Sequence, residues 1–309
     1  MERYRAVLYW ENTYMDPKDK IILVLGATGQ QGGETAKYLL KNRWKVRAFT
    51  RNPSSENSLR LKDLGAEIFQ GDMEDPYSLD LAMQGVYGVF SVQPSEWEPN
   101  ESTDANEVKV GKLVADSAKN AKVSHLVYSS VIGAERQSDF RKHKWEIEKY
   151  IHNLGIPFTI LRPTGFMENL IHSRSGIPGG RLYETVSPDS RIHLVSVEDI
   201  GTFAGLAFEN PGKYSGRTID LVGDSLTPLQ IVDILSIALD RRIEYMRIPL
   251  ETVYSHNKIL GLSTEWINRE GYPKVDIDSL RIENPGLLNF SQWLEKTGKV
   301  KIEEASIGS

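Results

Sequence analysis

A glycine-rich turn follows the first apolar run of the chain and could hold a phosphate group. Residues 26–33 read Gly-Ala-Thr-Gly-Gln-Gln-Gly-Gly, and they separate the apolar run 21–25 from a stretch with helical periodicity. Glycines let a backbone turn sharply and approach a pyrophosphate, whose charge then lies at the positive end of the helix. The turn is not a P-loop, because no Gly-Lys-Ser/Thr follows at the required spacing. The favoured ligand is a dinucleotide, and the alternative is a strand–helix turn without a ligand.

A basic residue stands where the second strand is expected to end. Sites that prefer NAD place Asp or Glu about 20 residues after the glycines, whereas an arginine there suits a 2′-phosphate. In this chain Arg51 follows Thr50 at that place. NADP(H) is therefore the predicted cofactor. The alternative is that Arg51 belongs, with Arg43, Lys45 and Arg47, to a solvated basic edge.

The elements that must position these residues alternate along the first half of the chain. Apolar runs predict strands at residues 21–25, 46–50, 66–69, 86–90, 125–128 and 158–161. Helical periodicity lies between them, as in residues 34–41, 104–121 and 140–154. Such alternation predicts an α/β fold with a doubly wound parallel sheet, the Rossmann fold.

The pattern changes after Pro163. A Gly/Pro/Ser/Arg stretch over residues 173–181 precedes a strand-like run, and Thr227 before Pro228 predicts the start of an amphipathic helix. We expect an N-terminal extension over residues 1–19 and an NADP(H)-binding Rossmann domain over residues 20–163. Residues 164–309 are predicted to form a smaller C-terminal α/β cap domain on the substrate side, with segments that return to the main sheet.

Composition excludes several classes of function. The chain has 37 basic and 42 acidic residues, a net charge of −5, and no apolar run long enough to cross a bilayer, so neither a nucleic acid nor a membrane is expected as a partner. The absence of cysteine excludes disulfides and thiolate chemistry. The six histidines show no metal-ligand spacing, so no metal is expected. The expected location is cytoplasmic, with a nuclear location left open.

These motifs together resemble the NmrA-like family of atypical short-chain dehydrogenases/reductases. The resemblance covers about residues 20–296 and rests on GATGQQGG (26–33), TRNP (50–53), GD (71–72), EVKVGKLVADSAK (107–119), RPTGFMEN (162–169), VEDIG (197–201) and QWLE (292–295). The cofactor contacts that it implies fall on Gly26, Ala27, Thr28, Gly29, Gln30, Gln31, Arg51, Asn52, Pro53, Ser54, Ser55, Asp72, Met73, Gln93, Pro94, Ser95, Lys109, Lys144, Phe166, Met167, Glu168 and Asn169.

The general acid of the wider superfamily is missing. Its members use a Tyr-x-x-x-Lys pair, in which the tyrosine moves the proton and the lysine lowers its pKa. Here Lys144 is present, but Phe140 occupies the tyrosine position. Tyr254 and Lys258 have the right spacing, yet they lie far beyond the strands that present a nicotinamide. His143 is an alternative acid, although it should point about 100° away from Lys144 around a helix. No catalytic residue is predicted.

Several polar residues have two interpretations at this stage. Asp75 either contacts an adenine or caps the helix that begins after it. Glu168 and Asn169 either line the nicotinamide pocket or cap a following helix. Ser129 and Ser130 are interpreted as structural or cofactor-loop hydroxyls rather than as substrate ligands.

Two functions remain open. The favoured hypothesis is an NADP(H)-binding redox sensor that lacks classical Tyr-Lys dehydrogenase activity and contacts a regulatory protein. The alternative is an NADPH-dependent reductase that transfers hydride directly to quinone-like or other conjugated acceptors. A sensor would need a switch, and we expect the loops 93–106 and 173–188 to order when the cofactor binds. A homodimer is left open.

Overall fold

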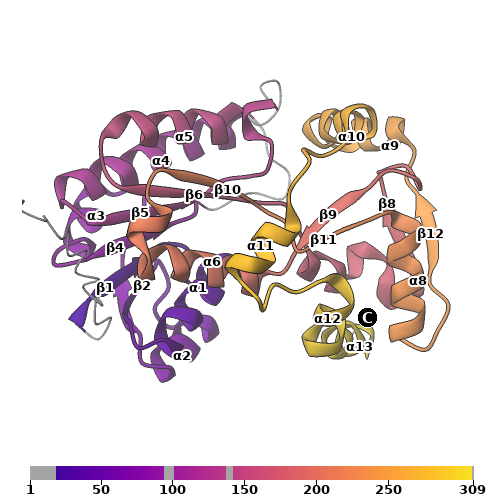
Figure 1. Ribbon diagram of the computed structural model, residues 1–309, viewed down its shortest axis with the longest axis horizontal. Coiled ribbons are helices and arrows are strands. Elements are labelled where there is room, and N and C mark those ends of the chain that lie inside the picture. Colours follow the sequence, from indigo (N-terminus) through magenta and orange to yellow (C-terminus); the bar gives the residue numbers. More distant parts are fainter. Residues whose placement is uncertain (1–18, 94–100, 137–141, 308–309) are drawn as a thin grey trace, which may run out of the picture.

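The fold is built on one large sheet with helices on both faces (Figure 1). The computed structural model describes residues 19–93, 101–136 and 142–307. Its main sheet has seven parallel strands in the order β10-β6-β5-β4-β1-β2-β3. The predicted fold class is therefore confirmed. None of the helices in these ranges is both long and apolar enough to span a membrane.

Six of the seven strands begin and end within two residues of their predicted positions. They are recognisable in the sequence because parallel strands covered on both faces carry nearly continuous apolar runs. The seventh strand, β10, was not predicted, since its sequence Arg-Thr-Ile-Asp-Leu alternates and only every second side chain is buried. The strands are β1 (Ile21–Val24), β2 (Lys45–Thr50), β3 (Glu67–Gln70), β4 (Gly88–Ser91), β5 (His125–Ser129), β6 (Phe158–Pro163) and β10 (Arg217–Leu221).

Two helical layers bury the two faces of this sheet (Figure 1). One layer contains α3 (Pro76–Ala82), α4 (Glu101–Asn120) and α5 (Lys142–Leu154). The other contains α1 (Gln30–Lys41), α2 (Glu56–Asp63) and α6 (Val197–Glu209).

Helix α6 packs against α1 at very short range. A Cβ atom on Gly201 would lie 2.7 Å from the carbonyl of Glu34, and one on Gly205 would lie 2.0 Å from the ring of Tyr38. Only glycine allows backbones to approach this closely. Both α6 and β10 follow residue 164 in the sequence, yet they lie in the layers of the main sheet (Figure 1). The boundaries between domains remain a prediction.

A second region follows β6 and has a core of its own. Its strands form two small sheets: β7 (Gly165–Phe166), β9 (Ile192–Val195) and β11 (Asp224–Leu226), and β8 (Arg181–Glu184) with β12 (Glu244–Arg247). Its helices are α8 (Pro228–Ala238), α9 (Leu250–His256), α10 (Lys258–Glu270), α12 (Phe290–Trp293) and α13 (Lys299–Ile307). The short α7 (Pro211–Tyr214) follows α6, and both α7 and α11 (Ile277–Glu283) pack on the core of the main sheet. Helix α8 begins where predicted, because Thr227 and Gln230 form a capping box.

One predicted switch loop is a packed segment instead. Residues 173–184 form two 3₁₀ turns and then β8, which pairs with β12. Ile177, Leu182 and Val186 are buried in the second region's core, so the expectation of a poorly packed loop over residues 173–188 is wrong. Gly176 and Gly180 adopt positive φ angles in tight turns between these buried apolar side chains. In the other predicted loop, residues 94–100 lie outside the described ranges and residues 101–106 begin α4.

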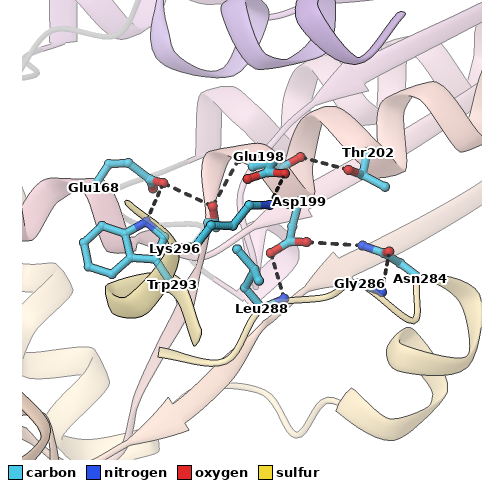
Figure 2. A network of polar contacts seen from close by, with 10 residues as sticks. Glu168, Glu198, Asp199, Thr202, Asn284, Gly286, Leu288, Trp293 and Lys296 are labelled. Atoms are coloured by element: carbon cyan, nitrogen blue, oxygen red, sulfur yellow. Dashed lines mark hydrogen bonds and ion pairs between the residues drawn. The ribbon is translucent and has the colours of Figure 1, made fainter. Parts of the chain in front are cut away.

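A buried polar network joins α6 to the C-terminal segment (Figure 2). Asp199 accepts hydrogen bonds from Asn284 Nδ2 at 3.2 Å and from the Leu288 N–H at 3.1 Å. Nearby, Lys296 forms an ion pair with Glu198 at 2.6 Å. Asp199 is only 2% exposed, and burial raises the pKa of its carboxyl from 3.8 to about 7. This aspartate therefore titrates near neutrality.

Stability should fall as pH rises through the range in which Asp199 loses its proton. The folded state keeps that proton up to about pH 7, whereas the unfolded chain loses it near 3.8. The stabilisation is thus complete below about pH 4, is lost as pH rises through about 7, and is on the order of 4 kcal/mol. Urea unfolding of the unmodified protein and of Asp199→Asn should show the decline as a difference in stability between the two, because burial lowers the pKa of His125 to about 4 and its opposite effect is common to both proteins. Asp278→Asn, on exposed α11 surface, should leave the decline intact.

Candidate functional site

The glycine turn has the geometry of an anion-binding helix start. Gly26 lies in the left-handed region with φ +65°, and a Cβ atom on Gly32 would lie only 2.2 Å from the Gly26 carbonyl oxygen. Helix α1 begins after Gly29, which offers no side-chain cap, and its first turn carries no acidic residue. The positive end of α1 is therefore open to an anion at the carboxyl edge of the sheet.

Two adjoining cavities run along this edge of the sheet. Their volumes are about 1000 Å³ and about 690 Å³, which suits a dinucleotide with room for a small second ligand. We call them the larger and the smaller cavity. The residues that line both are Gly26, Thr28, Arg51, Gln93 and Lys144. The carboxyl ends of β1, β2 and β4 thus contribute to one cleft, as is typical of doubly wound sheets.

Most of the predicted cofactor residues come together in this cleft. Those that line one cavity or both are Gly26, Thr28, Gly29, Gln30, Gln31, Arg51, Asn52, Ser55, Asp72, Met73, Gln93, Lys144, Phe166 and Asn169. Those that line neither cavity are Ala27, Pro53, Ser54, Lys109, Met167 and Glu168. Pro94 and Ser95 lie outside the described residues.

The residues that miss the cleft have structural roles or face elsewhere. Met167 has no exposed surface and belongs to the second region's core. Glu168 accepts hydrogen bonds from Trp293 Nε1, Ser196 Oγ and the Val197 N–H, so it holds the start of α6 (Figure 2). This geometry supports the helix-capping interpretation of Glu168, whereas Asn169 lines the smaller cavity.

Other ambiguous residues also take definite places. Asp75 caps α3 by accepting from two backbone N–H groups, whereas Asp72 lines the larger cavity.

The two serines at the end of β5 have hydrogen-bond partners of different kinds. Ser129 Oγ donates to Gln31 Oε1 at 2.6 Å and so contacts the first turn of α1, after the glycine turn. Ser130 Oγ donates to buried Glu148 Oε1 at 2.5 Å. Tyr254, on α9, donates to Glu265 and lines neither cavity.

Lys144 belongs to a cluster of charged side chains between α4 and α5. Its Nζ contacts Glu107 Oε1 closely, and both side chains are nearly buried. His143 Nδ1 lies 3.2 Å from Asp104 Oδ2, and its Nε2 lies 3.5 Å from Glu107 Oε2. We expected His143 to point away from Lys144. Both side chains line the larger cavity instead, and each contacts a carboxylate of α4 there. Asp104 and Glu107 stand three residues apart at a helix start, a spacing that could have identified them.

The far wall of the smaller cavity comes from the second region. Arg174, Ser263, Ile267 and Tyr272 line it, and Ile259 and Leu260 of α10 line the larger cavity. None of these six residues was predicted for the site, because nothing in the local sequence indicates that the turn around Arg174 or the segment around α10 folds back over the cleft. Residue spacing along α10 gives the only signal, because Ile259, Ser263 and Ile267 recur every four positions on one helix face.

Comparison with known proteins supports the resemblance. The model of the NmrA-like family matches residues 18–286. An NmrA-like family domain-containing protein of Dictyostelium discoideum is 29% identical over 273 residues, which are 82% of this chain and 88% of that protein. An NmrA-like family domain-containing oxidoreductase of Aspergillus versicolor is 32% identical over 244 residues, 69% of this chain and 68% of that protein.

Solved structures show the same fold at lower identity. NmrA, a negative transcriptional regulator, superposes with a TM-score of 0.76 at 21% identity, covering 93% of this chain and 98% of that one. An NADPH-dependent quinone oxidoreductase from Escherichia coli, complexed with NADPH, gives 0.73 at 22% identity, covering 89% and 98%. The family match extends over most of the chain and includes the glycine turn, Arg51 and helix α5 with Lys144, so this protein belongs to the NmrA-like family.

Proposed function

We propose that this protein is an NADPH-dependent reductase of quinone-like or other conjugated acceptors. The observation that carries the proposal is the second, smaller cavity, which adjoins the glycine turn and has aromatic and apolar walls. The kinship with proteins named as oxidoreductases supports it. It replaces the redox sensor as our favoured hypothesis, because the packed segment 173–188 removes one of the two switch loops that a sensor was expected to use.

The residues present fit an NADP(H) molecule. The start of α1 is uncapped and free of acidic side chains, which suits the pyrophosphate, and Arg51 lies at the end of β2 for a 2′-phosphate. Asp72 and Met73 line the larger cavity beside Asn52 and would border the adenosine half. Lys144, held by Glu107, would bind the nicotinamide ribose.

The protein's own chemistry in this reaction is positioning rather than proton donation. When bound, the cofactor supplies hydride, so that NADPH, a quinone and one proton become NADP⁺ and a hydroquinone. A quinone accepts hydride without a protein acid because the resulting charge is delocalised and then neutralised by a proton from water. The residue four positions before Lys144 is Phe140, which lies outside the described residues and cannot donate a proton. Phe166 and Tyr272 would hold the acceptor ring beside the glycine turn.

Arg51 should make the protein prefer NADPH to NADH. A charge-assisted contact between its guanidinium and the 2′-phosphate contributes about 1.5–3 kcal/mol, which is roughly tenfold or more in affinity. Titration of each cofactor by intrinsic fluorescence should show this preference, and Arg51→Ala should abolish it. Arg43→Ala, at the opposite end of β2 and absent from both cavity linings, is the matched control. Equal affinities in the unmodified protein would contradict the assignment.

The reductase proposal is tested by NADPH oxidation with a panel of quinones and conjugated dyes. We expect turnover well above the background rate with at least one quinone, and little with simple aldehydes or ketones because a positioned general acid contributes about 10²–10⁴ in rate. Absence of turnover with every acceptor, while NADPH binds normally, would refute the reductase and return the sensor as the better hypothesis.

A further inference from the structure

The two cavities differ sharply in the charges that line them. Among the described residues, the larger cavity has four carboxylates, on Asp72, Glu74, Asp104 and Glu107. The described lining of the smaller cavity has no carboxylate, and all its charged side chains are basic. This contrast stands out in a chain with a net charge of −5. With the cofactor assigned to Arg51 and the larger cavity, an anionic group on a second ligand is therefore favoured in the smaller cavity.

Arg174 is the basic residue that belongs to the smaller cavity alone. The other two basic residues in its lining, Arg51 and Lys144, also line the larger cavity and are needed for the cofactor. Arg174 comes instead from the second region, which lines this cavity together with the glycine turn. Its guanidinium can bind a carboxylate or sulfonate through two hydrogen bonds.

The turn that carries Arg174 is held in place by hydrogen bonds. The Ser175 N–H donates to the His172 carbonyl at 2.9 Å, and Ser175 Oγ donates to the Leu170 carbonyl at 2.9 Å. Gly176 follows with φ +80°, where a side chain would collide with the ring of Tyr183. Burial lowers the pKa of Arg174 from its ordinary value, in agreement with a side chain that is partly desolvated at the cleft. A fixed backbone limits the entropy cost of using this arginine as a ligand.

The remaining walls of the smaller cavity suit a flat ring system. Val131, Ile132, Phe166, Ile267 and Tyr272 supply apolar and aromatic surface. The Tyr272 ring stacks on His193, with centroids 4.9 Å apart and an interplanar angle of 21°, and this contact restrains its orientation. Such walls bury a conjugated ring, and a cation on a hydrogen-bonded turn at their edge can orient it.

We propose that the smaller cavity selects planar conjugated acceptors that carry an anionic substituent, and that Arg174 is the residue that determines this selectivity. The inference rests on the proposed reductase function and names its acceptor class. Neutral quinones are then poorer substrates than their sulfonated or carboxylated counterparts. The selectivity arises mainly in KM, because Arg174 binds a part of the acceptor that does not react.

The test compares anthraquinone sulfonate with anthraquinone sulfonamide substituted at the same ring carbon, so that charge differs while shape is kept. In the unmodified protein we expect kcat/KM for the sulfonate to exceed that for the sulfonamide by about tenfold or more. Arg174→Gln should bring the two values to within about twofold by raising KM for the sulfonate. Arg247→Gln removes one charge from exposed β12, outside both cavities, and should preserve the preference.

A second measurement separates failure of this inference from failure of the reductase. Equilibrium dialysis of anthraquinone sulfonate against protein saturated with NADP⁺ measures binding without turnover. Weaker binding by tenfold or more in Arg174→Gln than in Arg247→Gln supports the inference even when neither acceptor is reduced. Equal binding by the two variants, or equal kcat/KM for both acceptors in the unmodified protein, overturns it.

Discussion

Gly32→Ala is expected to reduce NADPH affinity by at least about a hundredfold. The new Cβ would lie 2.2 Å from the Gly26 carbonyl oxygen and 2.9 Å from the Ala27 nitrogen. Because these are backbone atoms, the turn itself has to move, and the pyrophosphate loses its contacts with the start of α1. Two charge-assisted hydrogen bonds of about 1.5–3 kcal/mol each account for a loss of this size. Fluorescence titration and calorimetry would measure it.

The adjacent glycine supplies the control. A Cβ on Gly33 meets the Ala27 carbonyl oxygen at 3.4 Å, so Gly33→Ala should bind NADPH normally and gain slightly in helix stability. The 2.2 Å approach indicates that Gly32 variants also lose stability, and thermal denaturation should reveal this. Normal NADPH binding by a folded Gly32→Ala protein would show that the turn is not a phosphate site.

Arg162→Met should cost about 3–5 kcal/mol of folding free energy. Glu148 is completely buried, and Arg162 neutralises it through contacts of 3.0 Å from Nε and 2.6 Å from Nη2. Arg162 Nη1 also lies 2.6 Å from Glu135 Oε2. Removing the arginine leaves a buried carboxylate without its counter-charge, which is the costly way to break such a pair. Urea denaturation at pH 7 would measure the loss.

The same substitution in an exposed ion pair should be far milder. Arg60 pairs with Glu56 at 2.6 Å on α2, and the two side chains are 70% and 77% exposed. Arg60→Met is therefore expected to cost no more than about 1 kcal/mol. Similar losses in the two variants would mean that burial of Glu148 does not govern the strength of its pair. Double substitution of Arg162 and Glu148 by apolar residues should recover part of the stability.

The sequence predicts the half of the site that depends on local chain geometry. The glycine turn, Arg51 and Lys144 each follow or occupy an element whose type is clear from periodicity, and the parallel sheet brings these elements to one edge. Glu168 was ambiguous, because a carboxylate near a strand end can face a ligand or a helix start equally well. Only its contacts with Ser196 and Val197, 28 and 29 residues later, and with Trp293, 125 residues later, show that it faces the start of α6.

The acceptor side could not be predicted in the same way. Arg174 and Tyr272 are 98 residues apart, and their meeting depends on long-range pairing such as that of β8 with β12. The stretch around Arg174 has the composition of a loop, and composition does not reveal that three buried apolar side chains anchor it. Local propensity and periodicity therefore describe the cofactor side, whereas tertiary packing creates the acceptor side.

The close approach of α6 to α1 restricts how this protein could be divided or recombined. A fragment ending at residue 163 would lose α6 and β10, which exposes the apolar face of α1 and makes β6, still paired with β5, a new edge strand. Edges of this kind promote aggregation. A chimera that exchanges acceptor-binding segments between relatives should therefore retain residues 197–221 from the parent that supplies the glycine turn. The part that relatives could exchange is therefore discontinuous in the sequence. It consists of the second region's segments before residue 197 and after residue 221.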